Sequence, residues 1–169
     1  FVCLALVRRS RGEPPLALAT LLRAWNAECR LMLRAFGWDM PWAEHAQADY
    51  VPDRPAGRPV DHAGVVLVHG FMCNRGLWLP WFAPLQARGH AYVAVNLEPV
   101  MGSIDEYADI IEDAVRQVTA ATGQAPVLLC HSMGGLAARA WLRAVPGADA
   151  RVHRVITLGT PHGGTWAAR

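Results

Sequence analysis

One short stretch constrains the fold more than any other part of this chain. Residues 127–130 form an apolar run, as expected of a strand that is buried on both faces of a parallel sheet. Ser132 follows, and Gly134 and Gly135 then open a segment with helical spacing of apolar residues that reaches Val145. A serine between a buried strand and a helix is typical of a sharp turn that holds a nucleophile in a strained backbone conformation. The stretch therefore predicts a strand, a nucleophilic serine and a helix in direct succession.

The residues that flank Ser132 suit such a turn. Side chains two positions before and after the serine must be small, because larger ones would collide with the neighbouring strand or helix. Cys130 and Gly134 occupy these positions, and Cys130 is a small departure from the usual G-x-S-x-G pattern. A lone serine before two glycines is more often a plain turn or a helix cap, but the strand and helix around it favour a nucleophile. His131 is adjacent, yet the turn points its ring away from the serine hydroxyl, so we do not assign it as the base.

Apolar runs and helical patterns alternate along the chain from Gly64 onwards. Buried strands are expected at residues 65–68, 91–97, 127–130 and 152–158. Helices are expected at residues 77–85 and 133–145, and between them a helix starts at a capping box of Ser103 and Glu106 and is closed by Gly123 and Pro126. The acidic residues of the middle helix should face outward, namely Glu106, Asp109, Glu112 and Asp113. This alternation predicts the α/β class, with a parallel sheet flanked by helices on both faces.

His69, Gly70 and Phe71 end the first of these strands. Carboxyl ends of parallel strands gather at one edge of a sheet, so this loop should lie beside Ser132. The backbone N–H groups of Phe71 and Met133 would then point at one oxygen atom. Two such donors stabilise the oxyanion of a tetrahedral intermediate, and loss of one typically costs about 2.7–4 kcal/mol. A histidine and a glycine alone would indicate only a turn, but their pairing with the serine stretch favours an oxyanion hole.

A third feature, Thr-Leu-Gly-Thr-Pro-His-Gly-Gly at residues 157–164, follows the last expected strand and should reach the same edge of the sheet. His162 within it is a candidate for the catalytic base. The surrounding proline and glycines favour a shaped loop instead, and we do not assign His162 to catalysis.

Three motifs together resemble one known family. Val-His-Gly-Phe at 68–71, His-Ser-Met-Gly-Gly at 131–135 and Gly-Thr-Pro-His-Gly-Gly at 159–164 occur in the order and spacing of the α/β-hydrolase fold. Within that fold they are similar to bacterial triacylglycerol lipases and esterases. The resemblance implies a nucleophile and two oxyanion-hole N–H donors, supported by four further motif residues. These residues are Ser132 (nucleophile), Phe71 and Met133 (N–H donors), and His69, Gly70, His131 and Gly134 (supporting).

The same resemblance leaves the acid and the base unassigned. The family order is serine, then Asp or Glu, then His, and the last two normally follow the third motif. Asp149 is the only acidic residue after Ser132, and the later histidines are His153 and His162. We therefore expect a hydrolase core truncated after the strand that follows the nucleophile helix, with its acid and base beyond Arg169. The chain alone should then be a poor catalyst.

The expected activity is hydrolysis of a carboxylic ester, of lipid or other acyl character, through an acyl-enzyme on Ser132. An aromatic group near the first loop, at Phe71, Trp78, Trp81 and Phe82, suits an apolar acyl group or simply forms core. Acyl transfer or thioester cleavage on the same machinery, and a non-catalytic lipid- or partner-binding protein, stay open as alternatives. The chemistry needs no metal or cofactor, and a net charge of +2 gives no support for nucleic acid. The four cysteines have no metal-type spacing, so we expect free thiols.

The first sixty residues form a separate part in this interpretation, with domains at 1–60 and 61–169. Residues 1–36 carry six Arg against two Glu, and apolar residues between Leu18 and Phe36 have helical spacing. Such a helix could lie on a membrane surface or pack on the following domain, and we favour packing. A Pro- and Gly-rich connector follows at 37–61, with a short strand at residues 49–51. The apolar residues 1–7 are too few to span a bilayer, although they could be the end of a longer membrane segment. Localisation therefore stays open between membrane-associated and cytoplasmic.

Overall fold

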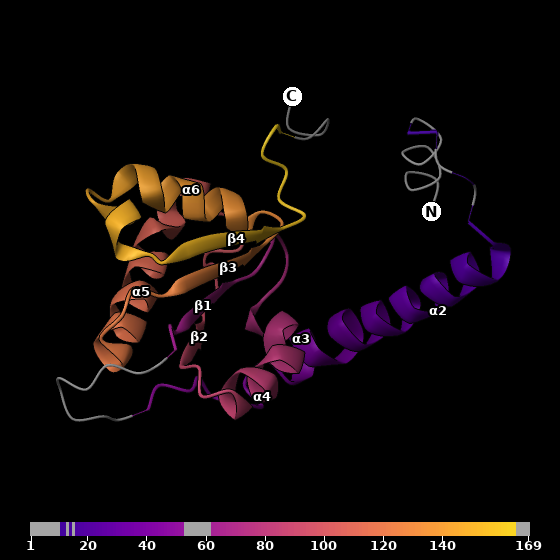
Figure 1. The fold of residues 1–169 in the computed structure, drawn as a ribbon, viewed down its shortest axis with the longest axis horizontal. Helices are drawn as coiled ribbons and strands as arrows, with labels where there is room; N and C mark the ends of the chain where they lie inside the picture. Colours follow the sequence, from indigo (N-terminus) through magenta and orange to yellow (C-terminus); the bar gives the residue numbers. More distant parts are fainter. Residues whose placement is uncertain (1–10, 13, 15, 53–61, 165–169) are drawn as a thin grey trace.

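A parallel sheet forms the centre of the computed structural model, which describes residues 11–12, 14, 16–52 and 62–164 (Figure 1). In these residues the sheet has four strands in the order β2-β1-β3-β4. The strands are β1 (Val65–Val68), β2 (Tyr92–Ala94), β3 (Val127–His131) and β4 (Arg154–Leu158). Every pairing between them is parallel, so the predicted α/β class is confirmed.

Helices cover both faces of this sheet (Figure 1). On one face, Val66 and Val68 of β1 pack with α5 (Ala108–Thr122) and α6 (Gly134–Ala144). On the other, Val65 and Leu67 pack with Trp78 and Phe82, from the 3-10 turn η2 (Arg75–Trp78) and from α4 (Leu79–Ala87). Two further 3-10 turns, η3 (Ile104–Tyr107) and η4 (Ala148–Arg151), precede α5 and β4. Alternate residues of one strand thus serve two separate cores, which explains why its sequence is apolar throughout.

The predicted capping box is present, but one acidic residue lies where it was not expected. Ser103 accepts from the Asp105 N–H, and Glu106 accepts from the Ser103 N–H, at the start of η3. Glu112, predicted to face outward, is only 5% exposed. Its carboxylate accepts hydrogen bonds from Trp141 of α6 and from Arg151 of η4, and the pairing with these donors explains its burial.

Strand β2 is shorter than the apolar run at 91–97 predicted. The Val95 N–H still donates to Leu67 O at 3.1 Å, but the Leu97 N–H donates to the Nε2 atom of His69 at 3.0 Å. The strand ends early because the His69 side chain, just after β1, accepts the hydrogen bond from the Leu97 N–H that a backbone carbonyl would accept in a continued strand. Residues 95–97 are nevertheless held against the carboxyl end of β1.

The strand predicted at residues 152–158 is present as β4, but the expectation that it is buried is wrong. Its residues alternate between exposed and half-buried, with Ile156 39% exposed and Leu158 37% exposed. The cause is its position, because β4 is the outermost strand on its side of the described sheet.

The N-terminal helix α2 (Leu18–Arg34) runs away from the sheet (Figure 1). None of its residues is buried, so the expected packing on the following domain is wrong for the chain described here. The helical path also continues beyond the expected end at Gly37, through the π-turn η1 (Ala35–Asp39) to α3 (Met40–Trp42). Asp39 is buried and pairs with Arg34 at 3.1 Å, which ties the two segments together.

The chain after α3 returns to the sheet. Tyr50 forms an antiparallel bridge with Tyr92, in place of the short strand predicted at 49–51. The proposed boundary between domains 1–60 and 61–169 stays a prediction, and residues 1–10 and 53–61 lie outside the described chain. Among the described helices, none has the length and apolar character needed to cross a bilayer.

Candidate active site

Ser132 occupies a sharp turn between β3 and α6. Its φ angle is +50°, in the left-handed region that side-chain-bearing residues rarely adopt. Its backbone N–H donates to Leu158 O at the end of β4, at 2.8 Å. The turn is thus fastened to the neighbouring strand, which offsets the backbone strain. In the described part of the chain, no hydrogen bond engages the Ser132 hydroxyl.

Three glycines bring the three sequence motifs into direct contact at this edge of the sheet. A Cβ atom on Gly70 would lie 2.9 Å from Cβ of Ser132, and one on Gly134 would lie 2.5 Å from the carbonyl oxygen of His69. A Cβ atom on Gly135 would lie 2.2 Å from Oγ1 of Thr160. Only glycine permits these approaches. The predicted meeting of the loops after β1, β3 and β4 is therefore seen in the structure.

Cys130, the departure from the usual pattern, lies in the core immediately before the turn. It is fully buried, and burial raises the pKa of its thiol to about 12. A thiolate is the nucleophilic form of cysteine, so this thiol is inert at neutral pH. Cys29, Cys73 and Cys130 are all free thiols, as expected, while Cys3 lies outside the described residues.

His69 is a buried link between β1 and the segment after β2. Its Nε2 accepts from the Leu97 N–H, so its Nδ1, 2.8 Å from Gly70 O, is the protonated nitrogen. Burial lowers the pKa of the ring, which favours this neutral tautomer. His69 therefore fixes the start of the loop that carries Phe71, and it does not face the serine as a base.

The loop after His69 supplies the first candidate oxyanion donor. Within the described residues, no hydrogen bond takes up the backbone N–H of Phe71, nor that of Met133 after the serine. Met72 has a φ angle of +55°, a second strained non-glycine position in this small region. Phe71 and Met72 are 49% and 65% exposed, so the loop presents apolar side chains to the surroundings.

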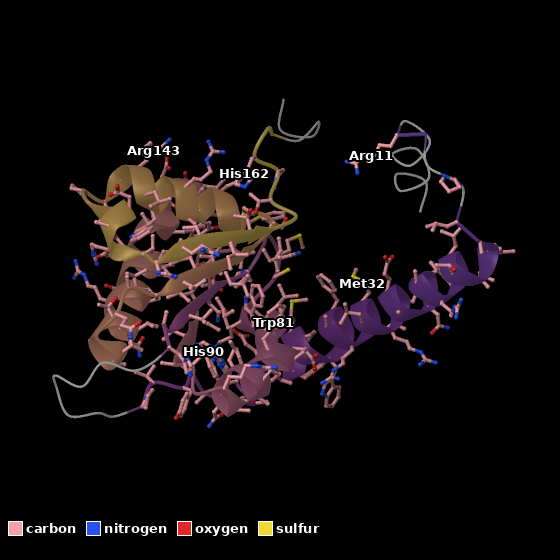
Figure 2. The ribbon with its side chains drawn as sticks, viewed as in Figure 1. Arg11, Met32, Trp81, His90, Arg143 and His162 are labelled. Carbon is pink, nitrogen blue, oxygen red and sulfur yellow. The ribbon has the colours of Figure 1, made fainter. Side chains whose placement is uncertain are left out.

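None of the nearby histidines meets the serine hydroxyl. The Nδ1 atom of His131 is buried without a partner in the described chain, and burial lowers the pKa of this ring. His162 instead has its Nε2 atom 3.2 Å from Oγ1 of Thr157, and Figure 2 shows it beside the end of β4. His153 precedes β4, and its N–H donates to Pro126 O at the opposite end of the sheet. The described residues thus hold a serine without a base.

The sequence did not reveal how the loop after Phe71 is anchored. Arg75 is buried, and its guanidinium donates to the carbonyl oxygens of Glu44 and Gln47 at 2.9 Å and to the Asp49 carboxylate at 2.7 Å. The preceding residue, Asn74, donates to Met40 O and to the Glu44 carboxylate. The sequence signal that could have predicted this anchor is an arginine within an apolar segment, because a buried charge requires hydrogen-bonding or charged partners.

The aromatic group near the loop divides into two sets. Trp78 and Phe82 belong to the core, whereas Phe71 and Trp81 are exposed. Only the exposed pair is accessible to a ligand. In the described stretches of chain, no cluster of three or more His, Cys, Asp or Glu side chains could hold a metal ion.

Comparison with known proteins agrees with this architecture. The sequence profile of the Alpha/beta hydrolase family matches residues 65–169. Bacillus licheniformis lipase BlEst2 in its mature form is similar at 25% identity and a TM-score of 0.57, over 67% of this chain and 47% of the lipase. Aspergillus fumigatus lipase B shares the fold at 20% identity and a TM-score of 0.58, over 75% of this chain and 33% of that enzyme.

The chain spans less than half the length of either of these lipases. A search of curated protein sequences found no match. The profile match covers more than half of the chain, and the parallel sheet, the strained serine turn and the glycine contacts all fall within it. This chain belongs to the α/β-hydrolase family.

Proposed function

We propose that the chain carries the nucleophile and oxyanion hole of a serine hydrolase that cleaves carboxylic esters. The observation that carries the proposal is Ser132 itself, at φ +50° on the turn between β3 and α6, with its hydroxyl unengaged by the described residues. The similarity to a bacterial lipase at 25% identity supports an ester as the substrate.

The proposed reaction uses this geometry in two steps. The Ser132 oxygen attacks the ester carbonyl carbon while a base takes its proton, and the N–H groups of Phe71 and Met133 stabilise the resulting oxyanion. The carbonyl re-forms, the alcohol leaves with that proton, and an acyl-enzyme remains. Water then attacks the acyl group, which releases the acid and restores the serine.

The base and its acidic partner would come from chain outside the described residues. No histidine in the described part approaches the Ser132 hydroxyl, and a serine without a base is a weak nucleophile. We therefore expect this 169-residue chain by itself to turn over p-nitrophenyl esters poorly. Reaction with a strong phosphonylating reagent should be slow but measurable, because the oxyanion hole alone gives a residual rate enhancement when other members of the catalytic set are absent.

A fluorophosphonate probe tests the nucleophile. The chain should be labelled, and Ser132→Ala should abolish labelling because the reacting oxygen is removed. Ser103→Ala is the matched control, since Ser103 caps η3 and lies outside the site, and it should label like the original chain. Equal labelling of the Ser132→Ala variant would refute the assignment. Absence of labelling in the presence of the chain that supplies the base and the acid would favour a non-catalytic binding protein.

A further inference from the structure

Helix α2 has an apolar stripe that no other described element covers. Large apolar side chains gather on one side, within roughly 60° of Leu18 around the helix axis, and their exposure runs from 46% at Phe36 to 74% at Leu33. Figure 2 shows Met32 projecting from α2 into open space. The apolar stripe consists of Leu18, Leu22, Trp25, Met32 and Leu33 of α2, and of Phe36 in the π-turn η1 that continues it.

The opposite side of the helix is basic. At 3.6 residues per turn, Arg23 and Arg30 lie roughly 120–140° around the axis from Leu18. Arg34 is paired with Asp39, and Glu28 is the only acidic residue of α2. An apolar face with Trp, Phe and Leu, opposed by an arginine-bearing face, is the pattern of a helix that lies in the plane of a lipid interface.

Two further features favour lipid over a protein partner. Trp25, Trp38 and Trp42 are 53%, 64% and 77% exposed, and tryptophan is enriched at the level of lipid headgroups. The basic excess continues before the helix, since residues 1–36 hold six Arg and two Glu. That charge complements an anionic surface.

The segment that directly follows α2, formed by η1 and α3, packs against the loop that carries Phe71. Ala35 and Met40 pack with Cys73, which follows the exposed residues Phe71 and Met72 on the same loop. We propose that α2 binds an anionic lipid surface through its apolar stripe and so holds this loop close to the lipid. The lipid binding does not depend on the role of Ser132, while its benefit to catalysis rests on the proposed function.

Vesicle co-sedimentation tests the binding. The chain should bind vesicles of phosphatidylcholine containing about one third phosphatidylglycerol more tightly than vesicles of phosphatidylcholine alone. Leu22→Glu should weaken the partition into anionic vesicles about tenfold or more, because it places a charge in the stripe that lipid would cover. Leu31→Glu is the matched control, since Leu31 is 60% exposed against 54% for Leu22, lies on the same helix and is off the stripe.

The added negative charge is the same in both variants, so only the position of the substitution differs. Leu31→Glu should change the partition by less than about threefold. Equal effects of the two substitutions, or no vesicle binding by the original chain, would overturn the proposal. So would a dimer in sedimentation equilibrium that Leu22→Glu dissociates, because a second copy would then cover the stripe. Fluorophosphonate labelling of each variant without lipid reports separately on Ser132, and circular dichroism confirms the fold.

Discussion

Removal of the Glu112 charge should change the acid stability of the whole α5–α6 layer by a calculable amount. Burial alone would raise the pKa of this carboxyl, but hydrogen bonds from Arg151, Trp141 and Arg116 lower it from 4.5 to about 2. Arg151 alone makes two bonds, at 2.7 and 3.0 Å. The side chain is 7% exposed, so solvent screens these contacts little.

The size of the effect follows from the pKa. At about 1.36 kcal/mol per pH unit, a pKa lowered from 4.5 to about 2 contributes about 3 kcal/mol to folding stability. Because the folded pKa lies below the unfolded one, this contribution is complete above about pH 5 and is lost as the pH falls towards 2. At pH 3, about 2 kcal/mol of it should be gone.

Urea unfolding of the original chain and of Glu112→Gln, at pH 7 and pH 3, measures this contribution. The glutamine does not titrate, so the stability difference between the two proteins should shrink by about 2 kcal/mol at the lower pH. Asp113→Asn is the control on the same helix, because Asp113 is exposed. A stability difference that stays constant between the two pH values would refute the reasoning.

Two further substitutions test how the site is built. Gly134→Ala should lower the melting temperature and abolish fluorophosphonate labelling, because the new Cβ would lie 2.5 Å from His69 O and 2.6 Å from Val68 O. Unchanged labelling would show that the serine turn can shift to accept the alanine side chain. Arg75→Met should cost about 1.5–3 kcal/mol in urea unfolding and slow labelling of Ser132, since it removes a buried guanidinium whose hydrogen bonds to Asp49 and to backbone carbonyls anchor the loop. Exposed Arg88→Met is its control and should match the original chain in both measurements.

The strand, serine turn and helix at residues 127–145 could be predicted because local pattern and tertiary role agree there. An apolar run needs a buried strand, and the glycines after Ser132 are required by contacts as close as 2.2 Å. The same agreement holds for the apolar face of α5, where Ile111, Val115 and Val118 are all buried. Local periodicity alone was therefore sufficient for most of the sheet and its flanking helices.

The sequence predictions were wrong where a residue distant in sequence determines the burial of a side chain or the end of a strand. Glu112 was expected to face outward with the other acidic residues of its helix, yet Arg151 and Trp141 from other elements make its burial favourable. Strand β2 ends early because His69 replaces a ladder partner. The Arg75 anchor joins residues between 19 and 31 positions apart in sequence, which no window-based pattern can detect.

A crystal structure of the phosphonate adduct tests the central claim most directly. The phosphorus should be bonded to the Ser132 oxygen, and the phosphonyl oxygen should lie about 2.7–3.1 Å from the backbone nitrogens of both Phe71 and Met133. That result would establish the nucleophile and the oxyanion hole together. An adduct on another residue, or a phosphonyl oxygen directed away from these two N–H groups, would contradict the account.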